Sequence, residues 1–160
     1  MIIKDGKGNE LLDVISVDEE TAQREYAPVT HALVVVKVGE EYLMGWNHGR
    51  QCWEIFGGCM DAGESLRQCI EREGYEELGL ENVEYQYLGL MHYHMAPEYF
   101  NPKWHEEYGA LYGVKIPETM METIERKRGD KEEIEKFAFY SCIKGESIAA
   151  IDERLLEFWK

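Results

Sequence analysis

The sequence predicts an α/β sandwich, in which β-strands are flanked by helices. Two observations lead to this prediction: the chain has several short runs of β-branched and aromatic residues, and two segments carry apolar residues at helical spacing. At 160 residues the chain is expected to form a single domain, 1–160, and a domain of this size buries about 70% of the surface that its unfolded form exposes. Its glycines are scattered and its four prolines are isolated, so no linker divides it.

The first predicted strands occupy residues 11–17 and 29–38. The second of these runs, VTHALVVVKV, is rich in β-branched residues, as expected of a strand that is buried on both faces. Strands are then predicted at 42–46 and 52–56, and the last of them ends abruptly at Gly57 and Gly58. The strands therefore lead the chain to a glycine pair.

A helix with clear end signals follows the glycine pair. Ser65 and Gln68 have the spacing of a capping box at its start, and Gly79 stands where a left-handed C-cap belongs. Its apolar residues form one stripe, made of Leu66, Cys69, Ile70 and Leu78. We expect this stripe to pack on the sheet and the opposite side of the helix to remain exposed.

The rest of the chain completes the sandwich. Strands are predicted at residues 84–94, 108–116 and 137–142, while 117–127 is either a short helix or an insertion. Residues 147–159 form an amphipathic helix, with apolar side chains at helical spacing.

The composition limits the partners and the location of the protein. With 17 basic and 32 acidic residues, the formal net charge is -15, which argues against a broad nucleic-acid surface. An anionic small molecule stays open if metal ions and local cations supply positive charge. The four cysteines form no CxxC pair, and neither a signal peptide nor a membrane-spanning run is evident, so we expect a soluble protein in the reducing cytoplasm.

Three glutamates in the capped helix need a physical explanation. Glu73, Glu76 and Glu77 stand at i, i+3 and i+4, so they share one face and repel each other by a few tenths of a kcal/mol per pair. A cation bound between the carboxylates would offset this repulsion, so this face of the helix is a candidate metal site. Carboxylate oxygens without a histidine or thiolate cluster favour Mg²⁺ or Mn²⁺ over zinc. Because Mg²⁺ usually shares a phosphate-bearing ligand, the pattern indicates a phosphate or diphosphate substrate.

The longer pattern around these glutamates resembles the signature of the Nudix hydrolase family, of the MutT-like type. The matching positions are Gly58, Glu64, Arg72, Glu73, Glu76, Glu77, Gly79 and Leu80. Gly74 departs from the family pattern, which usually has a bulkier residue there, and close approach of the helix to the sheet is one expected reason. Phe56 is a second departure, because many members have proline at that place.

The resemblance implies a fold, an activity and a set of roles. The fold would be the Nudix fold, an α/β/α sandwich with a mixed β-sheet. Glu73, Glu76 and Glu77 would bind Mg²⁺ or Mn²⁺, with a backbone carbonyl of the glycine pair, Gly58 first, as a further ligand. Arg72 would orient the glutamates, and Glu64 would pair with Arg72 or assist at the metal. The reaction would be metal-dependent hydrolysis of the diphosphate linkage in a nucleoside diphosphate linked to another group X. A homodimer is also expected.

Family members often use a further glutamate from a loop outside this motif. The segment Lys131-Glu132-Glu133-Ile134-Glu135 resembles the usual position, and Glu133 is the first choice. Another set of candidates lies in the other plausible loop and consists of Glu98, Glu106 and Glu107.

Substrate contacts are predicted on both sides of the motif. Arg50 and Trp46 precede it, and a later loop has side chains suited to stack on a base and touch a phosphate, namely Tyr99, Phe100, Lys103 and Trp104. In the same region, His92, His94 and His105 lack zinc-site spacing and are interpreted as ordinary polar or core histidines.

Three alternatives to this activity or substrate stay open. A Nudix domain that binds a nucleotide without cleaving it is one alternative, although its expected sign, loss of the glutamates, is not seen here. An isopentenyl-diphosphate isomerase-like enzyme is less favoured, because its catalytic cysteine would stand at Gly57 and the nearest thiol is Cys59. Pro97 lies close to the place of a proline typical of ADP-ribose pyrophosphatases, which makes ADP-ribose one candidate substrate.

Overall fold

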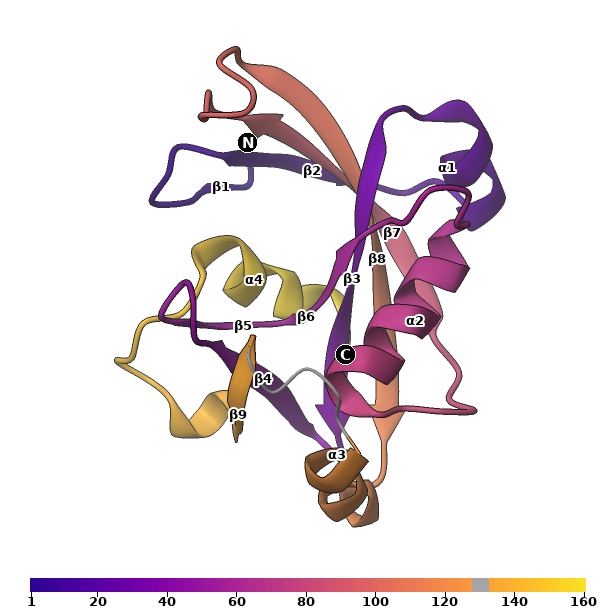
Figure 1. Ribbon diagram of the computed structural model, residues 1–160, viewed down its shortest axis with the longest axis vertical. Helices are drawn as coiled ribbons and strands as arrows, with labels where there is room; N and C mark the ends of the chain where they lie inside the picture. Colours follow the sequence, from indigo (N-terminus) through magenta and orange to yellow (C-terminus); the bar gives the residue numbers. More distant parts are fainter. Residues whose placement is uncertain (128–132) are drawn as a thin grey trace.

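The computed structural model describes residues 1–127 and 133–160, in which one mixed β-sheet is covered by helices on both faces (Figure 1). The strands follow the order β1-β2-β7-β8-β3-β4-β5, while β6 pairs with β3 and β9 pairs with β4. The α/β/α sandwich predicted from the sequence is therefore confirmed. Lys131 and Glu132, from the candidate acidic segment, lie outside the described residues.

The strands have the following bounds: β1 Ile3–Lys4, β2 Glu10–Ile15, β3 Val29–Val38, β4 Glu41–Asn47, β5 Cys52–Glu54, β6 Phe56–Cys59, β7 Gln86–Met95, β8 His105–Ile116 and β9 Ile134–Phe139. The helices are α1 Glu19–Glu25, α2 Leu66–Leu78, α3 Met121–Lys127 and α4 Ala150–Leu155. Short 3-10 turns occupy Glu118–Met120, Tyr140–Cys142 and Leu156–Phe158.

Strand β3 lies at the centre of the sheet and is the reason that the sheet is mixed. It pairs in parallel with β8 on one side and antiparallel with β4 and β6 on the other. Val34 and Val36 pack in the core beneath α1, α2 and α3, whereas Val35 packs in a second core beneath α4. Both faces of this strand are therefore buried, as its apolar run predicts.

Several predicted boundaries were wrong. The strand predicted at 52–56 is divided at Ile55, because β5 ends at Glu54 and a separate strand, β6, runs through the glycine pair, where Gly57 and Gly58 pair with Leu33 and Ala32. The last strand begins at Ile134 and ends at Phe139, and the C-terminal helix is shorter than predicted because residues 147–149 approach β5 in extended form, bonded to Trp53. Helix α1 was not predicted, although Asp18 caps it by accepting a hydrogen bond from the Thr21 N–H at 2.7 Å.

Helix α3 resolves the alternative left open for residues 117–127, which form a 3-10 turn and a short helix. Across residues 1–127 and 133–160, no helix has both the length and the apolar character needed to cross a membrane. All four cysteines are free thiols.

Candidate functional site

Helix α2 is held by the end signals read from the sequence. The Gln68 N–H donates to Ser65 Oγ at 3.1 Å and the Ser65 N–H donates to Gln68 Oε1 at 2.9 Å, which completes the capping box. Gly79 ends the helix with a φ of 67°, and its N–H bonds back to the last turn. The apolar stripe is buried in the core, so the helix presents its acidic side to the loop that precedes it.

Arg72 connects this loop to the carboxylates of the helix. Its guanidinium makes two hydrogen bonds to Glu64, at 2.6 and 3.0 Å, and one to the carbonyl of Cys59 at 2.9 Å. It also contacts Glu73 at 2.9 Å and Glu76 at 3.2 Å. The hydrogen bond from Arg72 holds the pKa of Glu64 below its usual range. The roles predicted for Arg72 and Glu64 agree with these contacts.

The glycine pair brings the backbone of β6 against two of the glutamates. The Gly57 N–H donates to Glu77 Oε1 at 2.7 Å, and Glu77 is only 3% exposed. A Cβ at residue 57, where φ is 134°, would overlap the carbonyl oxygen of Ala32. A Cβ on Gly58 would lie 2.6 Å from Glu73 Oε1. Glycine is therefore required at residue 57, where β6 meets β3, while a side chain at residue 58 would displace the Glu73 carboxylate.

Burial affects the glutamates of this face unequally. It raises the pKa of Glu73, which Arg72 partly opposes, whereas the side chain of Glu76 is 51% exposed. Within the part of the chain that the structure describes, no three His, Cys, Asp or Glu side chains converge as a ready metal cluster. The donors nevertheless suit a hard cation in kind, because Glu73, Glu76, Glu77 and the Gly58 carbonyl offer only oxygen.

Gly74 differs from what the sequence suggested. The glycine was expected to let the helix approach the sheet closely, but it leaves room for the side chain of Tyr85. A Cβ on Gly74 would overlap the hydroxyl of Tyr85, a buried residue just before β7. Among the described residues, this hydroxyl has no hydrogen-bond partner. The departure from the family pattern is therefore a packing exchange in which a tyrosine ring takes the place of a side chain on the helix.

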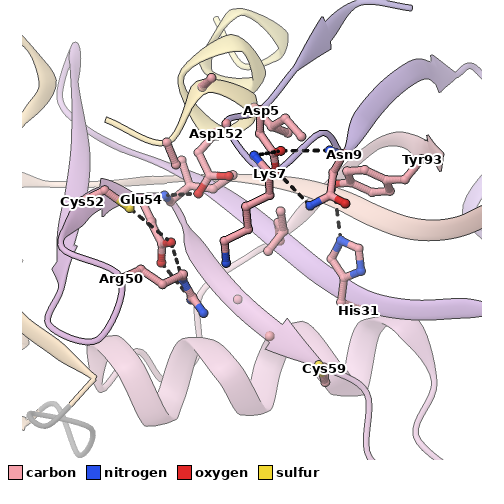
Figure 2. A pocket seen from close by; sticks show the side chains of 18 of the residues that line it. Asp5, Lys7, Asn9, His31, Arg50, Cys52, Glu54, Cys59, Tyr93 and Asp152 are labelled. Atoms are coloured by element: carbon pink, nitrogen blue, oxygen red, sulfur yellow. Dashed lines mark hydrogen bonds and ion pairs between the residues drawn. The ribbon is translucent and has the colours of Figure 1, made fainter. Parts of the chain in front are cut away.

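A pocket of about 950 Å³ opens beside the glycine pair, on the face of the sheet that carries α4 (Figure 2). Gly57, Gly58, Cys59 and Glu73 form its border with the carboxylate helix. The other walls come from segments far apart in the chain, and their side chains include Lys7, Asn9, His31, Arg50, Glu54, Tyr93, Glu107, Glu133 and Asp152. The volume is within the range of small-molecule sites.

One wall of the pocket contains an arginine and several carboxylates that lie close to one another. Arg50 binds Glu54 with two hydrogen bonds, at 2.6 and 3.0 Å, and lies 3.6 Å from Glu133. Asp152, near the start of α4, accepts the Ile55 N–H at 2.9 Å. Burial, together with the negative charge of Glu54, raises the pKa of Asp152 to about 7.

The opposite wall holds a histidine in its neutral form. His31 lies within hydrogen-bond distance of Thr30 Oγ1 at 2.8 Å and of the Tyr93 hydroxyl at 3.3 Å. Burial lowers the pKa of His31 to about 4, against the opposing effect of Glu107. Glu107 is in turn held by Thr30 at 3.2 Å and by His105 at 2.9 Å.

The candidates outside the motif separate into two groups. Glu133 and Arg50 line the pocket, as does Glu107. The loop aromatics do not line it: Tyr99 and Phe100 are 92% and 88% exposed, and Trp104 stacks on His94. Lys103 is likewise absent from the pocket wall. Their predicted contact with substrate therefore has no support from the pocket.

The histidines of this region lie in polar contacts with glutamates, and their interpretation as ordinary residues stays a prediction. His92 pairs with Glu106 at 2.8 Å and His94 with Glu10 at 3.3 Å. Glu106 is therefore held on the opposite face of the sheet from the pocket, with Leu90 and Tyr108. No cluster of metal-ligand type joins these groups within residues 1–127 and 133–160.

Sequence reasoning missed the pocket residues that lie far from the motif. Asp152 carried a weak signal, because an acidic residue close to the apolar stripe of an amphipathic helix needs an explanation. His31 carried another, as a polar residue inside VTHALVVVKV. Lys7 and Asn9 carried none, since a short polar turn near the N-terminus is common.

The fold and the site together define a small α/β protein whose carboxylate helix borders a ligand-sized pocket. The sequence model of the NUDIX domain matches residues 26–146, and the chain belongs to this family. No curated protein matches the chain. The resemblance read from the motif is thus confirmed.

Solved structures with the same fold share little sequence with this chain. A mutant form of the Bacillus subtilis pyrophosphohydrolase BsRppH has a TM-score of 0.62 and 16% identity, over 97% of this chain and 92% of that one. A MutT NUDIX hydrolase from Burkholderia pseudomallei has a TM-score of 0.58 and 16% identity, over 83% of this chain and 98% of that one. The NUDIX domain of Shewanella oneidensis NrtR, complexed with ADP ribose, has a TM-score of 0.59 and 13% identity, over 88% of this chain and 96% of that one.

Proposed function

We propose that this protein hydrolyses the diphosphate linkage of a nucleoside diphosphate joined to another group X, with Mg²⁺ or Mn²⁺ as the metal. The observation that carries the proposal is the position of Glu73, a motif carboxylate that Arg72 contacts at 2.9 Å, at the border of the 950 Å³ pocket. A phosphate chain at that border would place X inside the pocket.

The residues of the motif have distinct tasks in this reaction. Glu73, Glu76, Glu77 and the Gly58 carbonyl would hold the metal, which when bound lowers the pKa of water and neutralises phosphate charge. The Gly57 N–H fixes Glu77, and Arg72 keeps Glu73 and Glu76 close to the loop. Glu64 fixes the plane of the Arg72 guanidinium through its paired hydrogen bonds.

Glu133 is assigned the proton-accepting role outside the motif. It lies on the pocket wall with a half-exposed side chain, near Arg50 at 3.6 Å and Asn47 at 3.5 Å. A carboxylate on the pocket wall is the kind of side chain that serves as a general base. Glu107 is the alternative for this role, because it also faces the pocket.

ADP-ribose is the first substrate to test. The NUDIX domain of Shewanella oneidensis NrtR holds ADP ribose in a fold similar to this one. ADP-ribose has the required diphosphate, and its adenosine and ribose ends would use the walls on either side of the glycine pair. Since specificity in such proteins depends on loops, other nucleoside diphosphate derivatives belong in the same panel.

The test is turnover of this panel with Mg²⁺ or Mn²⁺, followed by identification of the phosphate-containing products. We expect cleavage of at least one compound and a loss of at least about a hundredfold in Glu77→Gln. Tight binding without cleavage would favour a nucleotide-binding regulator. Conversion of isopentenyl diphosphate without phosphate release would favour an isomerase. Full activity of Glu77→Gln would contradict the assigned metal site.

Two further expectations stay predictions. We place the activity in the cytoplasm, where the four free thiols would remain reduced. We also expect a homodimer, which light scattering coupled to size-exclusion chromatography would measure.

A further inference from the structure

The hairpin of β1 and β2 supplies a wall of the pocket that lies outside the region matched by the family. Its turn residues Asp5, Gly6, Lys7 and Asn9 line the pocket, whereas the NUDIX match begins at residue 26. Figure 2 shows the Lys7 side chain reaching from this hairpin into the pocket, between the Arg50 and Glu54 pair and His31. The chain thus adds a cation of its own to the site.

The backbone that carries Lys7 is held in one conformation. Asp5 Oδ1 accepts the N–H groups of Lys7 at 2.8 Å and Asn9 at 2.9 Å, while Asp5 Oδ2 accepts the Asn9 side-chain amide at 3.0 Å. Asn9 Oδ1 in turn accepts the Ala96 N–H at 3.0 Å, which ties the turn to the end of β7. Because the turn is ordered before a ligand binds, a contact from Lys7 costs less conformational entropy.

The charges of the pocket make Lys7 distinct. Arg50 is held by Glu54 at 2.6 Å, and His31 is neutral because burial lowers its pKa to about 4. Among the described residues that line the pocket, Lys7 is the one cationic side chain without a carboxylate within ion-pair distance. The other walls carry carboxylates, which would repel an anion.

We propose that Lys7 binds a phosphoryl group of the substrate, the one directed away from the carboxylate helix. This proposal rests on the proposed function, because it takes the ligand to be a diphosphate compound, and it adds to that function a residue that binds the second phosphoryl group. Motif carboxylates bind one end of the phosphate chain through the metal, and the Lys7 ammonium binds the other by charge-assisted hydrogen bonds. Lys7 is thus a substrate-binding residue supplied by the N-terminal hairpin.

The test measures the binding of inorganic pyrophosphate, with Mg²⁺ present, by isothermal titration calorimetry. Lys7→Met should raise the Kd by about tenfold or more, since it removes a hydrogen bond to a charged group. Lys4→Met is the matched control: it removes the same charge from β1 of the same hairpin, at an exposed residue that does not line the pocket, and should change the Kd by less than about twofold. Lys7→Arg should stay within about threefold of the wild type.

A second variant distinguishes a direct contact between Lys7 and pyrophosphate from the long-range electrostatic effect of the protein's charges. Asp5→Ala removes a negative charge from the pocket wall, which by long-range electrostatics alone would tighten pyrophosphate binding. If Asp5 positions Lys7, the same change weakens binding, and this is the expected result. Circular dichroism and thermal unfolding would establish that Asp5→Ala remains folded.

The outcomes distinguish this proposal from the proposed function. Equal Kd values for Lys7→Met and Lys4→Met, or no pyrophosphate binding by the wild type at millimolar concentration, would overturn the role of Lys7 whatever the turnover panel shows. Conversely, Lys7-dependent pyrophosphate binding without any turnover would support Lys7 while contradicting the hydrolase.

Discussion

Arg72 holds Glu64 through two parallel hydrogen bonds, with Nε 2.6 Å from Oε2 and Nη2 3.0 Å from Oε1. This fork fixes the plane of the guanidinium, whose other N–H groups reach Glu73 at 2.9 Å and the Cys59 carbonyl at 2.9 Å. A single arginine thereby joins the loop after β6 to the acidic face of α2. Glu64 acts on the site through Arg72.

Glu64→Gln should therefore lower activity without unfolding the protein. A neutral amide replaces one acceptor oxygen by a donor, so the fork is lost and Arg72 no longer has a fixed orientation. We expect kcat/KM and metal affinity to fall by about 10- to 100-fold. Arg72→Lys should have a similar effect, because an ammonium cannot form the fork. Steady-state kinetics and a metal titration measure both quantities.

Glu20→Gln is the control for Glu64→Gln. Glu20 pairs with Arg24 at 3.0 Å on α1, but both side chains are well exposed, so the pair contributes little. Activity should be unchanged in this variant. Wild-type kinetics and metal affinity in Glu64→Gln would show that the fork has no role in the site.

Gly74→Ala should destabilise the protein although alanine favours helices. The added Cβ would overlap the Tyr85 hydroxyl, and overpacking of this kind costs about 1–3 kcal/mol, against a gain of about 1 kcal/mol in helix propensity. Urea denaturation of the purified variant measures the net change in the free energy of unfolding.

The double variant Gly74→Ala with Tyr85→Phe tests the cause. Removing the hydroxyl leaves the ring carbon 3.0 Å from the new Cβ, so most of the overlap disappears. Tyr85→Phe alone should be close to neutral, since the hydroxyl has no hydrogen-bond partner among the described residues. We expect the double variant to be more stable than Gly74→Ala. Additive effects of the two changes would exclude this contact as the cause.

The sequence was most informative where the structure depends on neighbours in the chain. Helix α2 could be predicted because Ser65, Gln68 and Gly79 act within one or two turns, and the pairing of Arg72 with Glu64 follows from their positions beside that helix. The unusual Gly74 was visible as well. Its reason was not, because Tyr85 reaches it only through the tertiary fold.

The pocket could not be predicted for the same reason. Lys7, His31 and Asp152 come from three distant parts of the chain, and the sheet topology alone brings them to one cavity. The boundary error at Gly57 is related: the sequence shows a glycine that can end a strand, but only the pairing with Leu33 shows that Gly57 lies inside the separate strand β6.

Asp152 should make the protein less stable as the pH rises from about 4 to about 7. An aspartate in the unfolded chain titrates near 3.9, whereas burial raises the native pKa of Asp152 to about 7. Between these values the native state binds more protons than the unfolded state, so this group lowers the free energy of unfolding with rising pH. His31 acts in the opposite direction between about 4 and 6.5, because its native pKa is lowered.

Asp152→Asn isolates the contribution of Asp152 from that of His31. The variant should be more stable than the wild type at pH 8 by on the order of 4 kcal/mol, and the difference should shrink toward pH 4. Asp13→Asn, which replaces an aspartate at an exposed position, is the matched control. Urea denaturation at several pH values measures both. A constant difference in Asp152→Asn would mean that this carboxyl titrates alike in both states.

Cys59 should be the thiol whose modification blocks the site. Cys59 and Cys142 are exposed, whereas burial raises the pKa of Cys69 to about 12 and of Cys52 to about 11, so a disulfide reagent such as DTNB should label the first two quickly and the others only after unfolding. Cys59 borders the pocket, so its bulky adduct should abolish turnover. Cys59→Ser should keep its activity during labelling, and Cys142→Ser should lose it as the wild type does. Inactivation of Cys59→Ser at the wild-type rate would place the sensitive thiol elsewhere.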